Sequence, residues 1–185
     1  MGFRPMRRKK QELPMDETVA ILQRGTSGVL ALSGDEGYPY AVPMSYAYDG
    51  EGAGTGGGDA AAVRDVAPSL GRLVFHSAVA GHKVDAIARE GRASFCVIDQ
   101  DDVAPEKFTT LFRSAVAFGR IRVLDDPAEK RAAFELLSRR YAPDASREAE
   151  SEEIERFWNA LLMFELRIEH LSGKEAIELV RERKR

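Results

Sequence analysis

The sequence predicts an α+β fold around an antiparallel, barrel-like sheet, and three observations lead to this prediction. Patterns typical of strands follow one another along most of the chain, with a single helical pattern inserted among them. Parallel βαβ units do not recur. One long alternating segment, 109–124, precedes two helical patterns and a last strand. The 185 residues suit one domain, and a barrel this small has a filled interior, so ligands should bind at its surface or between subunits.

The first half of the chain should form a helix and a hairpin. The expected elements are a helix over 16–24, an apolar strand over 28–33, a turn over 34–37 and a second strand over 38–48. Pro39 and Pro43 lie inside that second strand and indicate an edge, a bulge or an interrupted ladder. An interrupted ladder would leave backbone groups free to meet a ligand.

The segment 49–69 is rich in Gly, Ala and Asp and lacks periodicity, which predicts a mobile loop insertion in the hairpin. Its glycine run resembles a phosphate-binding loop only superficially, because no Gly-Lys-Ser/Thr and no helix follow it. The composition offers little apolar surface to bury. We therefore expect that replacing the loop by a short turn changes stability by only about 1 kcal/mol and leaves unfolding cooperative.

The second half should complete the sheet. The expected elements are a strand over 72–76, a helix over 81–90, a strand over 92–99, a polar turn over 100–106, the long strand over 109–124, a helix from Asp126-Pro127, an acidic helix over 148–159 and a last strand over 160–168. Gly119 should mark a bend in the long strand. The basic stretches near the ends predict solvated tails over 1–13 and 176–185.

Composition narrows the class of protein. The formal net charge of −3 argues against a nucleic-acid binder, which would normally carry a basic face. Cys96 is the single cysteine, which excludes an intrachain disulfide and a cysteine-rich zinc site, and its apolar neighbours predict a buried thiol. No apolar run is long enough to span a bilayer and the start of the chain lacks an apolar signal core, so we expect a cytoplasmic protein without a membrane partner or a bound metal.

The most informative segment is 73–83. An apolar strand ends in His76 and Ser77, and after a short connection Gly81-His82-Lys83 begins a helix. A helix N-terminus with free N–H groups and a nearby cation is a natural site for an anion, above all a phosphate. Alternatively, His76 is a surface histidine at a strand end, and the two possible cations are the solvated first turn of an ordinary helix.

Four segments together resemble a known family. They are Gly28-Val29-Leu30-Ala31-Leu32, the strand Pro39-Tyr40-Ala41-Val42-Pro43-Met44-Ser45-Tyr46, Phe75-His76-Ser77-Ala78 and Gly81-His82-Lys83. This pattern resembles the FMN-binding split β-barrel family, in its pyridoxamine 5′-phosphate oxidase-like branch that includes the nitroimidazole-resistance proteins. Arg113-Ser114 and the late Ser172-Gly173-Lys174 fit the same branch, so the resemblance covers nearly the whole chain. It implies a split barrel with flanking helices and a homodimer with FMN at the interface.

The resemblance also implies site residues. The strand that contains Tyr40, Val42, Pro43, Met44 and Ser45 corresponds to the one that runs along the flavin ring and ribityl chain. The other implied cofactor contacts are His76 and Ser77 at the strand end, Gly81, His82 and Lys83 at the phosphate, and Arg113 and Ser114. We expect Lys83 and His82 to bind the phosphate, with hydroxyl hydrogen bonds from Ser77 and Ser45.

The chain departs from the oxidase pattern at two places. The oxidase has a basic residue at both ends of the flavin strand, where this chain has Tyr40 and Ser45, and the tail lacks its Arg-x-His substrate signature. Pyridoxamine phosphate is therefore disfavoured as a substrate. The leading hypothesis is an FMN-dependent oxidoreductase acting on a small, nitroaromatic type of substrate, with His76 as a proton donor or substrate contact. The alternatives are that His76 only hydrogen-bonds the flavin, or that the barrel is a non-catalytic flavin or haem carrier or sensor, with His76 or His82 as axial ligand.

Overall fold

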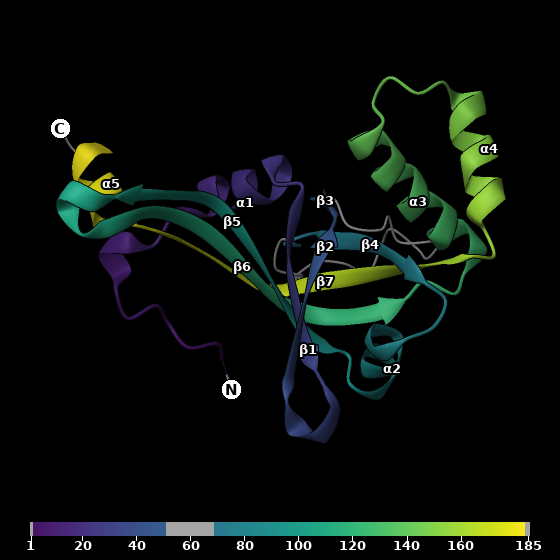
Figure 1. Ribbon diagram of the computed structural model, residues 1–185, viewed down its shortest axis with the longest axis horizontal. Helices are drawn as coiled ribbons and strands as arrows, with labels where there is room; N and C mark the ends of the chain where they lie inside the picture. The colour runs from purple at the N-terminus through teal and green to yellow at the C-terminus, as the bar shows by residue number, and fades with distance from the viewer. Residues whose placement is uncertain (1, 51–68, 184–185) are drawn as a thin grey trace, which may run out of the picture.

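A seven-stranded antiparallel sheet carries the fold in the computed structural model, which describes residues 2–50 and 69–183 (Figure 1). The strands are β1 (Ser27–Ser33), β2 (Pro39–Ser45), β3 (Ala47–Asp49), β4 (Arg72–Ala78), β5 (Arg92–Ala104), β6 (Thr109–Val123) and β7 (Leu161–Glu175). Their order in the sheet is β2-β1-β5-β6-β7-β4-β3, and every neighbouring pair is antiparallel. This is the α+β split-barrel class that the sequence predicts.

Helices pack against the middle of the sheet and at its two ends. They are α1 (Met15–Arg24), α2 (His82–Arg89), α3 (Pro127–Tyr141), α4 (Arg147–Phe157) and α5 (Ile177–Arg183), with short 3₁₀ turns η1 (Lys9–Gln11), η2 (Asp35–Gly37) and η3 (Pro105–Lys107). Figure 1 shows α3 and α4 together at one end of the sheet and α5 at the other, beside the tip of the β5–β6 hairpin. Among the described residues, no helix has the length and apolarity needed to cross a membrane.

The β1–β2 hairpin is confirmed, but the single strand predicted over 38–48 is two strands. The chain leaves β2 at Ser45 and joins the opposite edge of the sheet as β3, next to β4. The break falls at Tyr46, whose backbone N–H donates to the Thr26 carbonyl at 3.4 Å and to the Tyr141 hydroxyl at 2.9 Å. The Tyr46 side chain is fully buried and its hydroxyl donates to the Leu22 carbonyl at 2.8 Å. This anchoring lets one continuous segment contribute β2 to one edge of the sheet and β3 to the opposite edge.

Two strands are longer than predicted. The polar turn expected over 100–106 instead continues β5 to Ala104, because its backbone pairs with the start of β6. The strand expected to end at Ile168 runs to Glu175, so Ser172-Gly173-Lys174 lies inside β7. The bend predicted at Gly119 is confirmed: the β6–β7 register shifts there, and a Cβ atom at Gly119 would lie 1.9 Å from the Arg167 carbonyl oxygen.

The core has two parts because β4 is buried on both faces. Leu73 and Phe75 point into the barrel, where they join a cluster that includes Phe95 and Phe164. Val74 points the other way and packs with a smaller cluster beneath α3, made of Ala47, Leu124, Ala133, Leu137 and Met163. Since side chains alternate along a strand, His76 falls on the α3 face and Ser77 on the barrel face.

The solvated tails predicted over 1–13 and 176–185 are only partly solvated: residues 2–10 are almost all exposed, but the segments next to the sheet pack on it. Near the start, Leu13 is buried and its N–H donates to the Gly173 carbonyl, and the Gln11 side chain donates to the Glu175 carbonyl. Near the end, α5 packs beside η1, and Arg183 reaches Glu175. Of the loop expected over 49–69, residues 51–68 lie outside the described residues.

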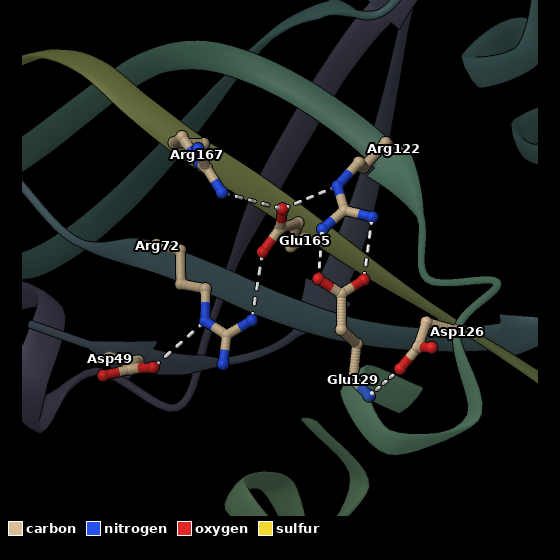
Figure 2. Close-up of polar contacts among 7 residues, drawn as sticks. All are labelled: Asp49, Arg72, Arg122, Asp126, Glu129, Glu165 and Arg167. Atoms are coloured by element: carbon tan, nitrogen blue, oxygen red, sulfur yellow. Dashed lines mark hydrogen bonds and ion pairs between the residues drawn. The ribbon is translucent and has the colours of Figure 1, made fainter. Parts of the chain in front are cut away.

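A buried carboxylate joins three strands, as Figure 2 shows. Glu165 on β7 is 1% exposed, and its two oxygens lie 3.0 Å from Arg72 on β4 and 2.7 Å from Arg122 on β6. A third guanidinium, Arg167, lies 3.6 Å away. Arg72 also reaches Asp49 on β3 at 3.0 Å. Each buried charge therefore has a partner of opposite sign, which a low-dielectric site requires.

The network continues to α3. Arg122 forms a two-pronged pair with Glu129 at 3.0 Å, and Glu129 follows the helix cap Asp126 (Figure 2). The Asp126 carboxylate accepts from the N–H groups of Ala128 and Glu129, both at 2.9 Å. Asp126 is thus the N-cap residue of α3, and the helix begins where the Asp126-Pro127 pair predicted.

Removing this cap should weaken α3 measurably. We expect Asp126→Ala to lower the free energy of unfolding by about 1 kcal/mol, because two first-turn N–H groups lose their acceptor. Asp126→Asn keeps an acceptor oxygen and should cost only a few tenths of that. Urea unfolding of the two variants measures the difference, and equal losses would contradict the assignment of the cap.

Candidate functional site

The site begins at the turn between β4 and α2. Gly81 has φ +122°, a conformation that side-chain-bearing residues rarely adopt, and no atom lies within 4 Å of where a Cβ would be. The Gly81 carbonyl accepts from the N–H groups of Val84 at 2.8 Å and Asp85 at 3.2 Å. Within the described residues the N–H groups of His82 and Lys83 have no backbone acceptor. The first turn of α2 thus presents two free donors over open space.

Lys83 has no counter-ion among the residues that the structure describes, although a desolvated ammonium normally has one. Its side chain is half-buried, and burial lowers its pKa below the ordinary 10.5. In the described part of the chain its one polar contact is the Met44 thioether, with 3.1 Å between Nζ and Sδ. A thioether is a weak acceptor, so most of the hydrogen-bonding capacity of this cation is unused. An anion at the start of α2 would satisfy it.

His82 is held in place by two neighbours. Its ring stacks on Tyr40 with 4.1 Å between centroids and 20° between planes. Its Nε2 atom lies 3.5 Å from the carboxylate of Asp35, which also pairs with Arg89 at 3.1 Å. The Asp35 carboxylate takes up part of the hydrogen-bonding capacity of the His82 imidazole. His82 therefore holds Tyr40 and the β1–β2 turn against α2, and Lys83 is the stronger of the two donors to an anion.

His76 lies between the start of α2 and a cavity beneath α3. His76 is exposed overall, but desolvation of its imidazole by the surrounding protein, and secondarily the charge of Lys83, lower its pKa below 6.5. The imidazole is therefore neutral at pH 7, with one nitrogen able to donate and the other to accept. Ser45 lines the same cavity, whereas its neighbour Met44 points to Lys83, as strand alternation requires.

The structure brings most of the predicted residues together. Tyr40, Met44, Ser45, His76, Gly81, His82 and Lys83 gather around the start of α2. Val42 shares the Tyr40 face and packs on the core, Pro43 is exposed on the opposite face, and Ser77 is buried on the barrel side.

Arg113 and Ser114 do not join this group within one chain. His76 pairs with Met163 near the start of β7, while Arg113 pairs with Glu175 at its end. That length of extended strand is about 40 Å. Arg113 instead lies beside the buried Glu175 at 3.3 Å, and its buried Nε atom has no hydrogen-bond partner among the described residues.

Sequence reasoning missed the cavity itself. It has a volume of about 520 Å³ and lies between α3, α4 and the ends of β2, β4 and β7. Its helical lining includes Phe134, Leu137 and Phe157. In the sequence these residues look like ordinary core positions of amphipathic helices, so no local signal separates them from the core.

Comparisons with known proteins agree with this architecture. The family model described as pyridoxamine 5′-phosphate oxidase matches residues 14–175. The chain therefore belongs to the pyridoxamine 5′-phosphate oxidase family. A comparison with the curated proteins finds no match.

Solved structures share the fold. A candidate 5-nitroimidazole antibiotic resistance protein from Bacteroides thetaiotaomicron has a TM-score of 0.63 at 18% identity, covering 89% of this chain and 86% of that one. An FAD- and haem-binding protein from Mycobacterium smegmatis also has a TM-score of 0.63, at 22% identity and coverages of 90% and 73%. A flavocytochrome from Azotobacter vinelandii reaches 0.66 at 19% identity, with coverages of 94% and 72%. At sequence identities this low, the structural similarity shows a shared fold and nothing further.

Proposed function

We propose that this chain is an FMN-binding flavoprotein that works as an oxidoreductase on small aromatic acceptors of the nitroaromatic type. The observation that carries the proposal is the half-buried Lys83 ammonium at the open first turn of α2, whose one polar partner among residues 2–50 and 69–183 is the Met44 thioether. A phosphate there would accept from Lys83 and from the free first-turn N–H groups. Family membership and the flavin-binding structural relatives support a flavin as the phosphate carrier.

The residues around Lys83 suit the rest of such a cofactor. Tyr40, Val42 and Met44 lie on the core-facing side of β2, where Tyr40 contacts His82 and Met44 contacts Lys83. Pro43 and Ser45 are exposed on the other face of the strand, which is open to a cofactor. When bound, the flavin would supply the redox chemistry, and the protein would orient it and exclude water. The neutral His76 lines the cavity with Ser45, where it could hold a proton for a substrate.

A homodimer is part of the proposal. Arg113 and Ser114 lie far from Lys83 in one chain, so they reach a flavin only if a second copy presents the far end of its β6–β7 pair. Exposed apolar side chains on the β5–β6 region, among them Ile98, Val103, Phe108 and Phe118, are available for such an interface. Light scattering at micromolar concentration with FMN present should give the mass of two chains.

Lys83→Ala should weaken FMN binding about tenfold to a hundredfold while leaving riboflavin binding nearly unchanged, because riboflavin lacks the phosphate. Lys83→Met should behave in the same way, since it keeps the aliphatic stem and removes only the charge. Quenching of flavin fluorescence on titration measures both affinities. His82→Ala should have a smaller effect, because its imidazole is already in contact with the Asp35 carboxylate.

The matched control is Arg139→Ala, which removes an exposed cation paired with Glu135 on α3. It should leave both affinities unchanged. Equal losses for FMN and riboflavin in Lys83→Ala would show that the phosphate assignment is wrong. The visible spectrum of the purified protein separates the alternatives: a flavin spectrum that bleaches with NADH or NADPH supports turnover, a flavin that resists reduction favours a carrier, and a Soret band identifies haem.

A further inference from the structure

The cavity beneath α3 has a distinctive lining. Its walls are apolar and aromatic, formed by Phe134, Leu137, Ala142, Phe157, Leu161 and Met163. A few polar groups converge on it: His76 and Ser45 from the strand ends, Ser138 and Tyr141 from α3, and Glu153 from α4. Its volume of about 520 Å³ falls in the range of small-molecule sites.

The α3 wall of the cavity is fixed at both ends. At the C-terminal end, the Tyr141 hydroxyl accepts the Tyr46 N–H at 2.9 Å and lies against the Thr26 and Tyr46 carbonyls. Near the N-terminal end, Lys130 donates to the Trp158 carbonyl at 2.6 Å, and its ammonium lies 4.6 Å from the indole centroid. The cavity is thus preformed, and the Tyr141 hydroxyl is already used, so this residue offers a ligand its ring.

Charge in the cavity disfavours anions. Among the described residues that line it, none is a lysine or an arginine, and the one ionised group is the Glu153 carboxylate, 3.8 Å from Arg156. His76 is neutral at pH 7. A phosphate or carboxylate placed here would lose water without gaining a cation. The Lys83 end of the site, on the other side of His76, has the opposite preference.

We propose that this cavity is the substrate pocket and that it takes an uncharged aromatic compound of about two or three rings rather than a phosphorylated or carboxylated one. As a substrate assignment it rests on the proposed function, since the substrate must face a cofactor held at Lys83. The class of ligand rests on the lining alone. His76 lines the cavity and is close enough to Lys83 to be affected by its charge, so it would lie at the reacting end of the ligand.

A matched pair of fluorescent probes tests the class of ligand. N-phenyl-1-naphthylamine is uncharged, and 8-anilinonaphthalene-1-sulfonate has the same rings plus a sulfonate. Both brighten in apolar surroundings, so titration of the full-length protein gives their affinities. The neutral probe should bind with micromolar affinity and the sulfonate at least about tenfold more weakly.

Variants locate the probe. Ser138→Trp fills the cavity from α3 and should weaken the neutral probe at least about tenfold. Ala132→Trp puts the same indole on an exposed position of α3 and should leave the probe's affinity unchanged. Ser45→Lys adds a cation at the cavity wall and should strengthen the sulfonate about tenfold while barely changing the neutral probe. Thermal unfolding identifies any variant that has lost its fold.

The outcomes separate this inference from the proposed function. Equal affinities for the two probes, or neutral-probe binding that survives in Ser138→Trp, would overturn the pocket assignment, whatever the flavin does. FMN binding is measured independently by quenching of flavin fluorescence in the same protein. Probe binding that follows the expected pattern in a chain that takes no flavin would overturn the proposed function and leave the class of ligand standing.

Discussion

Glu165→Gln should lower the free energy of unfolding by about 3 kcal/mol, the loss typical of breaking a buried ion pair by removing one partner. The carboxylate is 1% exposed and joins Arg72, Arg122 and Arg167 across three strands (Figure 2). Without its charge, the nearly buried Arg72 guanidinium keeps only Asp49. Urea unfolding followed by circular dichroism measures the loss.

Glu169→Gln is the matched control on the same strand. Glu169 pairs with Arg120 at 3.3 Å, but both side chains are about half exposed or more. Exposed pairs contribute little, so this substitution should cost at most about 0.5 kcal/mol. Similar losses in the two variants would contradict the role given to burial.

The difference between wild type and Glu165→Gln should depend on pH. Desolvation by itself would raise the pKa of Glu165, but the hydrogen bonds from Arg72 and Arg122 outweigh it and hold the pKa below the ordinary 4.5. The unfolded chain therefore binds the proton more readily than the folded chain does. The carboxylate contributes its full stability above pH 4.5 and loses it as the pH falls toward the folded pKa. The unfolding curves of wild type and variant should converge over that acid range.

A mixed dimer in which one chain carries Lys83→Ala and the other carries Arg113→Gln should bind FMN tightly at one of its two sites. In the proposed dimer each flavin takes Lys83 from one chain and Arg113 from the other. Each homodimer of a single variant then has two damaged sites, each about tenfold or more weaker. In the mixed dimer both substitutions fall in one site and the other site is intact. Glutamine at position 113 can still donate to Glu175, which preserves the local packing.

The mixed dimer is prepared by co-expression with two different tags and sequential purification. Flavin titration should then show half the wild-type capacity at wild-type affinity. Wild-type FMN affinity in the Arg113→Gln homodimer would place Arg113 outside the flavin site. A mixed dimer with only weak sites would contradict the assignment of Lys83 and Arg113 of one site to different chains. A mixed preparation that behaves as two separate monomers would contradict the dimer itself.

Local patterns in the sequence determined much of this protein. Alternation predicted β6, the turn over 34–37 predicted the β1–β2 hairpin, and Asp126-Pro127 predicted the start of α3. Gly81-His82-Lys83 at a helix start predicted an anion site, and the structure adds an ammonium that has no counter-ion within the described part of the chain. Each of these features depends on residues that are close in the chain, so the sequence carries its signal directly.

The tertiary structure decided the features that join distant residues. The break at Tyr46 depends on Tyr141, and the Glu165 network on Arg72, each a partner more than ninety positions away. The end of β5 forms from polar residues because β6 supplies its backbone partners, and α5 forms on a segment that reads as a tail because η1 packs against it. The cavity exists because two helices leave space above strand ends. Such pairings are set by long-range packing, which leaves no periodic trace in the sequence.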